Sequence, residues 1–335
     1  MNNPNFEKKI PTDRLTILTD PIPYGKDFFR FLFKILLIKA RNILYSFIGK
    51  KVQKYRGHHA VTRSLIEGLE KNNKKFFYNP ISFNQITDTV VVLSGPHTLE
   101  QCIEFKKKGI IKKIFAGPNI VIFSSDKNNL IAAKEVDCVI TPSEIINQLY
   151  LEDNPSLKNR IVSWPAGVNT EFWKPKFANR REKILIYEKQ IKGPVGPVQP
   201  YASYIISKGY DVHIIQYGNY DYTEYLHHLQ ESILMVGFVT DESQGIAWAE
   251  AWSCDVPILV WNNHTNIYNG RTYHCTPAPY LTKENGLFFD NFDDFVLKFN
   301  EWEQGKYQFS PRKWCKDNMS DEACAKKLIN IIEKC

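Results

Sequence analysis

The chain has 335 residues, of which 43% are hydrophobic and 24% charged, and its formal net charge is +7. This composition excludes a disordered chain, and the length suits two domains rather than one core. The modest positive charge is compatible with a nucleic acid, an anionic membrane surface or a phosphorylated small molecule, and it does not choose among them.

The seven cysteines are scattered along the chain and form no Cys-x-x-Cys pair. An odd set without such pairs favours free thiols in a reducing compartment over a disulfide framework or a zinc site. The first thirty residues lack the layout of a signal peptide. We therefore expect a cytoplasmic protein.

Residues 28–48 are densely apolar but contain four cations, Arg30, Lys34, Lys39 and Arg41. Four charges make a membrane-spanning helix unfavourable. On a helix, three of them (Arg30, Lys34 and Arg41) fall in a narrow sector and form a cationic stripe. Two interpretations stay open, a peripheral membrane contact through 28–48 and a core helix with one solvated edge.

Short β-rich runs alternate with longer amphipathic segments in the first half of the chain, and apolar strands of this kind are typical of sheets covered on both faces. Strands are predicted at Leu15–Thr19, Lys75–Tyr78, Thr89–Leu93, Lys113–Ala116, Ile120–Phe123, Cys138–Thr141 and Ile161–Trp164. Helices are predicted at 60–72, 98–109, 127–135 and 143–151. Thr98 with Gln101 has the spacing of a capping box, and Ser143 is placed to cap a helix that starts at Glu144. The alternation predicts a parallel α/β sheet.

A turn-rich segment at 165–175 precedes a second set of elements with the same alternation. Strands are predicted at 183–189, 211–218, 233–238 and 256–261, with helices near 200–208, 222–230, 245–253 and 320–334. The chain is therefore predicted to form an N-terminal Rossmann-like domain (1–168, with an insertion at 21–56), a second one (169–318) and a C-terminal helix (319–335) that can pack back on the first.

Residues 241–261, DESQGIAWAEAWSCDVPILVW, have the pattern of a loop, a helix and a buried strand. Gly245 permits another group to approach the backbone closely. The helix that follows has unpaired N–H groups and a positive dipole end, which attract phosphate. Glu242 lies in the loop and Glu250 about one turn inside the helix, so the segment predicts an anion site flanked by two carboxylates.

This segment resembles the donor-binding signature of family 4 of the retaining glycosyltransferases, which is Glu-x7-Glu followed by a small-residue helix and a strand that contains proline. Glu242 and Glu250 have that spacing, and EAWSCDVPILV matches the usual continuation. The resemblance implies the GT-B fold, with two doubly wound parallel-sheet domains that face a cleft. It also implies that Glu242, in a catalytic position, contacts the donor sugar and that Glu250 binds the ribose hydroxyls. Ser243 and Gly245 are assigned to donor binding with them.

Three further segments are similar to elements of this family. IYEKQIKG places Lys189 and Lys192 where members carry an arginine and a lysine for the donor phosphates, and the alternative is a pair of surface lysines. GVNTEFWKP resembles the element that enters the second domain, with Asn169 in place of aspartate. Gly57 is the single glycine at a position where the family has a two-glycine loop against the phosphates.

Two residues of the first half follow predicted strands, at the edge where doubly wound folds place ligands. Family members often carry a histidine near the transferred sugar, which would make His97 catalytic; alternatively, His97 simply precedes a helix. Asn119 would bind a hydroxyl or form a plain turn. The acidic cluster Asp290, Asp293 and Asp294 is read as a helix cap rather than a metal site.

These observations predict a hexosyltransferase that moves a sugar from a nucleoside-diphosphate sugar to a hydroxyl on a glycan or lipid-linked acceptor. The resemblance implies retention of configuration, no metal and no cofactor, and no nucleic acid partner is expected. No Walker loop, Gly-x-Gly-x-x-Gly motif or nucleophile elbow is present. Two alternatives stay open, a catalytically inactive glycan- or nucleotide-binding protein of this fold and a nucleotide-sugar epimerase.

Overall fold

The computed structural model describes residues 14–24, 28–33, 36–37, 58–176, 183–189 and 198–335. Contacts between residues divide the chain into two compact units. The first consists of Met1–Thr141, Tyr150–Trp164 and Lys326–Cys335, and the second of Pro142–Leu149 and Pro165–Ala325. The domain bounds given from the sequence stay a prediction.

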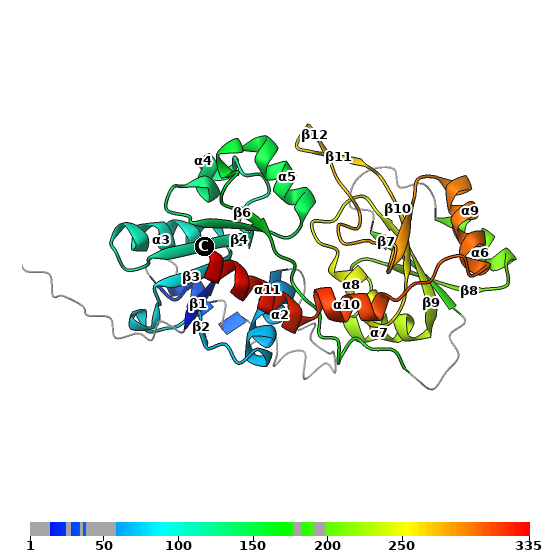
Figure 1. Cartoon of the computed structure of the whole chain (residues 1–335), viewed down its shortest axis with the longest axis horizontal. Helices are drawn as coiled ribbons and strands as arrows, with labels where there is room; N and C mark the ends of the chain where they lie inside the picture. The colour runs from blue at the N-terminus through cyan, green and yellow to red at the C-terminus, as the bar shows by residue number, and fades with distance from the viewer. Residues whose placement is uncertain (1–13, 25–27, 34–35, 38–57, 177–182, 190–197) are drawn as a thin grey trace, which may run out of the picture. The chain divides into compact units, whose positions relative to one another are not determined.

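The first unit contains a six-stranded parallel sheet with the strand order β2-β1-β3-β4-β5-β6 (Figure 1). Its strands are β1 (Leu15–Thr19), β2 (Phe76–Tyr78), β3 (Thr89–Ser94), β4 (Lys113–Asn119), β5 (Cys138–Thr141) and β6 (Ile161–Ser163). Every residue of β1 and β5 is buried, as expected for strands covered on both faces. Six of the seven strands predicted for this half are confirmed.

The predicted strand Ile120–Phe123 is wrong, because a side chain binds the backbone that a neighbouring strand would need. The carboxylate of Asp126 accepts hydrogen bonds from the backbone N–H groups of Ile122 (3.1 Å) and Phe123 (2.9 Å). The segment is therefore a loop, and β4 ends at Asn119.

The longer helices of the first half of the chain are α2 (His58–Lys71), α3 (Pro96–Lys107) and α5 (Glu144–Asp153), with short 3-10 turns η2 (Phe83–Gln85), η3 (Leu130–Ala132) and η4 (Pro155–Leu157). The predicted helix 127–135 is wrong: only α4 (Asp126–Asn129) and η3 form there. Lys127, Asn128 and Asn129 all have positive φ, a conformation that cannot continue a right-handed helix.

The predicted capping box is also wrong. Helix α3 begins earlier, at Pro96, whose missing N–H is tolerated in a first turn. Thr98 is fully buried, and its hydroxyl has no hydrogen-bond partner among the described residues. Helix α5, by contrast, starts at Glu144 as predicted.

The second unit contains a five-stranded parallel sheet with the order β13-β10-β9-β7-β8. Its strands are β7 (Lys183–Lys189), β8 (Asp211–Gln216), β9 (Ser232–Val239), β10 (Ile258–Trp261) and β13 (Gly286–Phe289). Its helices are α6 (Gln199–Ser207), α7 (Tyr222–Glu231), α8 (Ile246–Ser253), α9 (Phe292–Glu303), α10 (Pro311–Met319) and the start of α11 (Asp321–Lys334), which belongs to the first unit from Lys326 onward. The strands and helices predicted for this half are confirmed within a few residues, and the α/β parallel-sheet class holds for both units.

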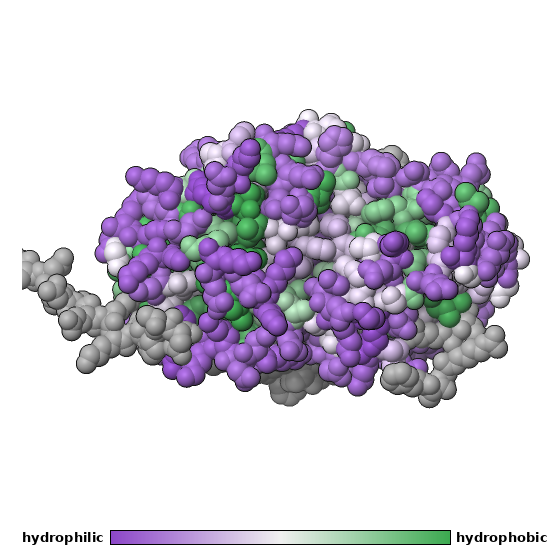
Figure 2. Space-filling model, viewed as in Figure 1, coloured by the Kyte–Doolittle hydropathy of each residue, from purple (hydrophilic) through white to green (hydrophobic). Residues whose placement is uncertain are grey.

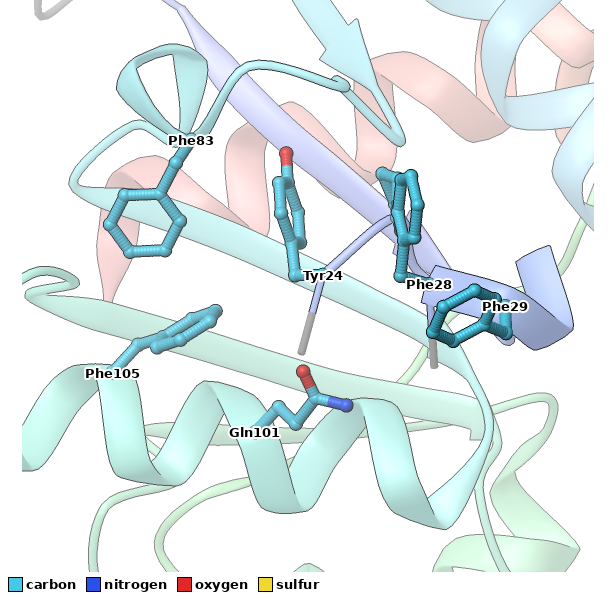
Figure 3. Close-up of a pocket in the computed structure, with 7 residues that line it drawn as sticks. Tyr24, Phe28, Phe29, Phe83, Gln101 and Phe105 are labelled. Atoms are coloured by element: carbon cyan, nitrogen blue, oxygen red, sulfur yellow. The ribbon is translucent and has the colours of Figure 1, made fainter. Parts of the chain in front are cut away.

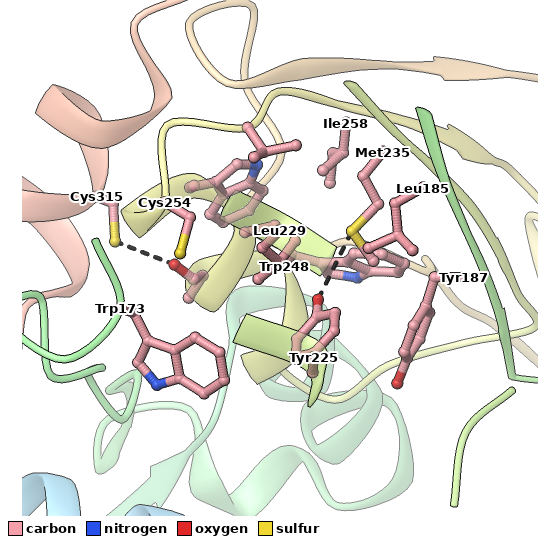
Figure 4. Close-up of a cluster of buried hydrophobic side chains, with 14 of the residues drawn as sticks. Trp173, Leu185, Tyr187, Tyr225, Leu229, Met235, Trp248, Cys254, Ile258 and Cys315 are labelled. Atoms are coloured by element: carbon pink, nitrogen blue, oxygen red, sulfur yellow. Dashed lines mark hydrogen bonds between the residues drawn. The ribbon is translucent and has the colours of Figure 1, made fainter. Parts of the chain in front are cut away.

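Hydrophobic side chains cover both faces of the second sheet. Along β7, Leu185 and Tyr187 join a cluster around Trp248, shown in Figure 4, whereas Ile184 and Ile186 join a cluster with phenylalanines of α9. This alternation follows from the period of two residues in a strand. The sheet is therefore the middle layer of its unit.

A β-hairpin in the second unit was not predicted. Its strands are β11 (Thr265–Tyr268) and β12 (Arg271–His274), which pair antiparallel. The two-residue turn is Asn269-Gly270, with φ of +50° and +80°. Asn-Gly is the preferred sequence for a turn with two positive φ angles, so the signal was present in the sequence.

Hydrophilic residues cover most of the molecular face in Figure 2. Among the described residues, no helix combines the length and the apolar character needed to cross a membrane.

Candidate functional site

The candidate site lies where two adjacent parallel strands of the second unit end. Lys189 is the last residue of β7 and pairs in register with Val239, the last residue of β9. The loop that follows β9 carries Glu242. The structure brings the two predicted residues together, because Nζ of Lys189 lies 2.5 Å from Oε1 of Glu242. The ion pair is sheltered, since the two side chains are only 14% and 15% exposed.

Burial raises the pKa of the Glu242 carboxyl above its usual range. The charge and the hydrogen bond of Lys189 act in the opposite direction, and the charge of Asp241 adds to the effect of burial. The Lys189 ammonium also lies over the ring of Tyr217, 4.7 Å from its centroid. The lysine is therefore held between a carboxylate and an aromatic face.

Replacing Lys189 by methionine is expected to raise the pKa of Glu242 further, because the favourable charge is lost while the burial remains. The measurement is a pH titration of the glutamate carboxyl carbons by ¹³C NMR in the variant and the unsubstituted protein. Lys183→Met is the matched control, since Lys183 pairs with Glu231 at the other end of β7. An unchanged or lower Glu242 midpoint in Lys189→Met contradicts the ion pair.

Hydrogen bonds to main-chain groups of two other segments hold the loop between β9 and α8 in place. The side chain of Gln244 is buried; its amide N–H donates to the carbonyl of Ala166 (2.7 Å), and its oxygen accepts from the Ala166 N–H (2.8 Å). The backbone N–H of Glu242 donates to the carbonyl of Thr276 at 3.0 Å. These bonds hold the loop in one conformation.

Two side-chain contacts add to this anchoring. The carboxylate of Asp241 accepts hydrogen bonds from the Tyr273 hydroxyl and from the side-chain amide of Asn266 (2.9 Å), both in the hairpin. The hydroxyl of Ser143, the serine predicted as a helix cap, donates to the carbonyl of Ser243 at 2.6 Å in the loop between β9 and α8. The side chain of Ser243 itself is exposed.

Gly245 precedes α8 with φ of +79°, a conformation that favours glycine. A Cβ atom at this position would lie 2.3 Å from Cδ1 of Trp248. Trp248 is almost fully buried, and its indole N–H donates to the carbonyl of Pro277 at 2.7 Å. The start of the helix is therefore packed directly against a fixed tryptophan.

The second predicted carboxylate borders the same tyrosine cluster as the first. Burial, the charge of Tyr220 and then the charge of Glu250 raise the pKa of Tyr225. Burial is the largest cause that raises the pKa of Tyr187. Interactions with Tyr220 and Tyr225, and then the charge of Glu242, raise it further. The Tyr187 and Tyr225 rings lie 6.0 Å apart, and the Tyr220 hydroxyl donates to that of Tyr187 at 3.2 Å. Both carboxylates therefore act electrostatically on one buried tyrosine cluster of the second unit.

The other predicted residues are not brought into this group. His97 is on α3 in the first unit, where its exposed ring lies 3.0 Å from the Glu100 carboxylate. Asn119 ends β4 in the first unit, and its side-chain N–H₂ group is buried without a hydrogen-bond partner among the described residues. Lys192 and Gly57 lie outside the described residues.

Sequence reasoning missed Asp20, which follows β1 at the same sheet edge as Asn119. A Cβ on Gly95, whose φ is +92°, would lie 2.3 Å from that of Asp20, and the Gly95 N–H donates to the Asn119 carbonyl at 3.2 Å. The Asp20 carboxylate pairs with Arg30 at 3.3 Å. A polar residue directly after a predicted strand was the available signal.

The acidic cluster of the last third lies at the start of a helix, and the residue that caps this helix is Asn291. The side chain of Asn291 accepts from the backbone N–H of Asp294 at the start of α9. Asp294 accepts from the Asp290 N–H and pairs with Lys298 at 2.7 Å.

No protein-family model and no curated protein sequence matches the chain. Several solved structures do match the chain. A lipopolysaccharide outer core galactosyltransferase, WaaB in its apo form, has a TM-score of 0.57 at 12% identity, over 96% of this chain and 100% of that one. A glycosyltransferase from Rickettsia africae ESF-5 has a TM-score of 0.54 at 11% identity, over 96% and 97%. The catalytic domain of starch synthase IV from Arabidopsis thaliana has 0.50 at 11%, over 84% and 78%. These similarities show that the chain has the GT-B fold of glycosyltransferases.

Proposed function

We propose that this protein is a retaining glycosyltransferase of family 4 that moves a hexose-type sugar from a nucleoside-diphosphate sugar to a hydroxyl acceptor, a glycan or a lipid-linked molecule. The observation that carries the proposal is the sheltered ion pair between Lys189, at the end of β7, and Glu242, in the loop that leads into α8, with Glu250 on that helix. The GT-B fold, shared with glycosyltransferases of known structure, supports it.

In this proposal the two glutamates bind the donor. Charge-assisted hydrogen bonds connect Glu250 to the ribose hydroxyls and Glu242 to the sugar. The starch synthase domain that shares the fold was solved with ADP and acarbose, which supports a nucleotide as the kind of partner. Ser243 and Gly245 form the loop against which the diphosphate lies.

The positive groups of the site stabilise the leaving diphosphate. Lys189, Lys192 and the N-terminus of α8 neutralise the charge that develops as the bond to the sugar breaks, and they do so without a metal. The leaving phosphate then takes the acceptor's proton on the same face, which retains the configuration. Lysine neutralises phosphate but lacks the bidentate geometry of arginine, so we expect charge stabilisation with little directional preference.

The acceptor side belongs to the first unit. We assign His97 a catalytic position near the transferred sugar. Asn119 and Gly57 are assigned to donor binding, Asn119 at a hydroxyl and Gly57 in the loop near the donor phosphates. A cytoplasmic protein with a peripheral membrane contact through residues 28–48 completes the proposal, and lipid-linked acceptors are compatible with that contact.

A thermal-shift screen against UDP, GDP, ADP and their sugars tests the donor assignment. A matching nucleotide at about 100 times its Kd is expected to stabilise the protein by about 2.7 kcal/mol. Glu250→Gln is expected to remove most of that shift, whereas Glu224→Gln, an exposed position on α7, is expected to leave it unchanged. No stabilisation by any of these compounds overturns the proposal.

Product analysis separates the two alternatives. Nucleotide binding without turnover on any acceptor favours an inactive binding protein. Conversion of the donor sugar in the absence of an acceptor favours an epimerase.

A further inference from the structure

The first unit exposes an apolar helical segment. Residues 28–33 and 36–37 are helical. Phe29, Phe33 and Leu36 are 78%, 63% and 64% exposed. Single exposed hydrophobic residues are common, but several on one short segment mark an interaction site.

An apolar cavity of about 490 Å³ lies beside this segment. Figure 3 shows Phe28 and Phe29 of the helical segment on one side and Gln101 and Phe105 of α3 on the other. The cavity is lined by Pro23, Tyr24, Phe28, Phe29, Phe83, Gln101 and Phe105. Its volume falls within the range of small-molecule sites, about 300–1,000 Å³.

The lining selects a hydrocarbon over a polar ligand. The rings of Phe83 and Phe105 meet edge to face with centroids 5.1 Å apart, and Tyr24 packs edge-on against Phe83 at 5.8 Å. The Tyr24 hydroxyl donates to the carbonyl of Pro80, so its polar atom is already satisfied. Gln101 is the one lining side chain with an amide, and a sugar here would leave most of its hydroxyls without partners.

The charge of the sequence that contains the apolar segment indicates which kind of surface would bind this segment. Residues 28–57 contain eight lysines and arginines and no aspartate or glutamate. The rest of the chain has 35 basic and 36 acidic residues, so the net positive charge of +7 arises from this segment. A basic stretch of sequence that also carries exposed phenylalanines matches an anionic lipid surface, which offers both a hydrocarbon layer and negative headgroups.

We propose that the exposed side chains of residues 28–33 and 36–37, together with the aromatic cavity, form a lipid face that docks on an anionic bilayer, with the cavity holding a hydrocarbon chain of one lipid. The inference gives the proposed membrane contact a location and a partner. It rests on that contact and not on sugar transfer, because none of the donor-binding residues takes part.

Vesicle flotation of the full-length protein tests the lipid face. We expect flotation with vesicles that contain phosphatidylglycerol, and little with phosphatidylcholine alone or at high salt. Phe29→Ser/Phe33→Ser/Leu36→Ser is expected to lower the partition coefficient on the order of a hundredfold, because three apolar side chains no longer enter the bilayer. The matched control is Ile206→Ser/Leu297→Ser, at 58% and 56% exposed positions of the second unit, and it is expected to float like the unsubstituted protein.

The cavity is tested by placing a tryptophan in its wall. In Phe83→Trp, lipids brominated on their acyl chains are expected to quench more fluorescence than in the unsubstituted protein, and absence of this extra quenching overturns the hydrocarbon site. Equal flotation of the triple-serine variant overturns the lipid face. A dimer in lipid-free solution that this variant converts to a monomer assigns the face to a second copy instead. Failure of the donor proposal appears separately, as absent nucleotide stabilisation in a protein that still floats.

Discussion

Glu242→Gln is expected to lower kcat/KM for sugar transfer on the order of a hundredfold. The substitution keeps the shape of the side chain and removes its charge, so the hydrogen bond to the sugar loses its ionic character, a loss of about 1.5–3 kcal/mol. Lys189 is also left sheltered without its carboxylate partner, which disturbs the cation needed for the diphosphate. The measurement is steady-state transfer with the donor identified by the nucleotide screen.

Two controls separate catalysis from folding. Glu188→Gln neutralises the neighbouring carboxylate, which bonds to Gln216 on β8, and it is expected to keep normal transfer. Combining Glu242→Gln with Lys189→Met is expected to cost less than the sum of the single effects, because the two residues act through one ion pair. Normal kcat/KM in Glu242→Gln, or strictly additive losses in the pair, contradicts the proposed role.

Gly245→Ala is expected to destabilise the second unit by about 2–4 kcal/mol and to weaken nucleotide binding. The positive φ of this residue strains any L side chain, and the new Cβ would meet Trp248 at 2.3 Å. The indole has little room to move, because a Cβ on Gly237 in β9 would lie 2.5 Å from its other end. Trp248 is therefore wedged between a strand and the start of its own helix.

Gly209→Ala is the matched control for this substitution. Gly209 also has a positive φ of +90°, but a Cβ there would meet no atom within 4 Å. It is expected to lose only the conformational part, about 1 kcal/mol. Denaturant unfolding of both variants measures the difference, and equal losses would show that contact with Trp248 does not limit position 245.

The Lys189–Glu242 pair has a consequence for the proposed donor binding. Each charge of the pair satisfies the other, so a diphosphate bound as proposed would compete with Glu242 for Lys189, and the sugar would compete with Lys189 for Glu242. A donor that offers both groups compensates both losses, whereas a free nucleotide compensates one. We therefore infer that the pair favours intact nucleotide sugars over their products.

The sequence by itself determined the order of strands and helices and the parallel α/β class, because buried strands and amphipathic helices have distinct apolar periods. It failed at Ile120–Phe123 and at 127–135, where the Asp126 side chain and three positive φ angles override the local pattern. These interactions join residues close together in the sequence, but they do not change the spacing of apolar residues from which strands and helices are predicted.

Only the tertiary structure decided which of the predicted residues come together. Lys189 meets Glu242 because β9 lies next to β7 in the sheet, an order that no local pattern encodes. Gln244 binds Ala166 across 78 residues of sequence, and Asp241 binds Tyr273 of the hairpin across 32. The sequence fixes which side chains are available locally, and the folded sheet brings them together, because the contacts depend on strand order rather than on neighbours along the chain.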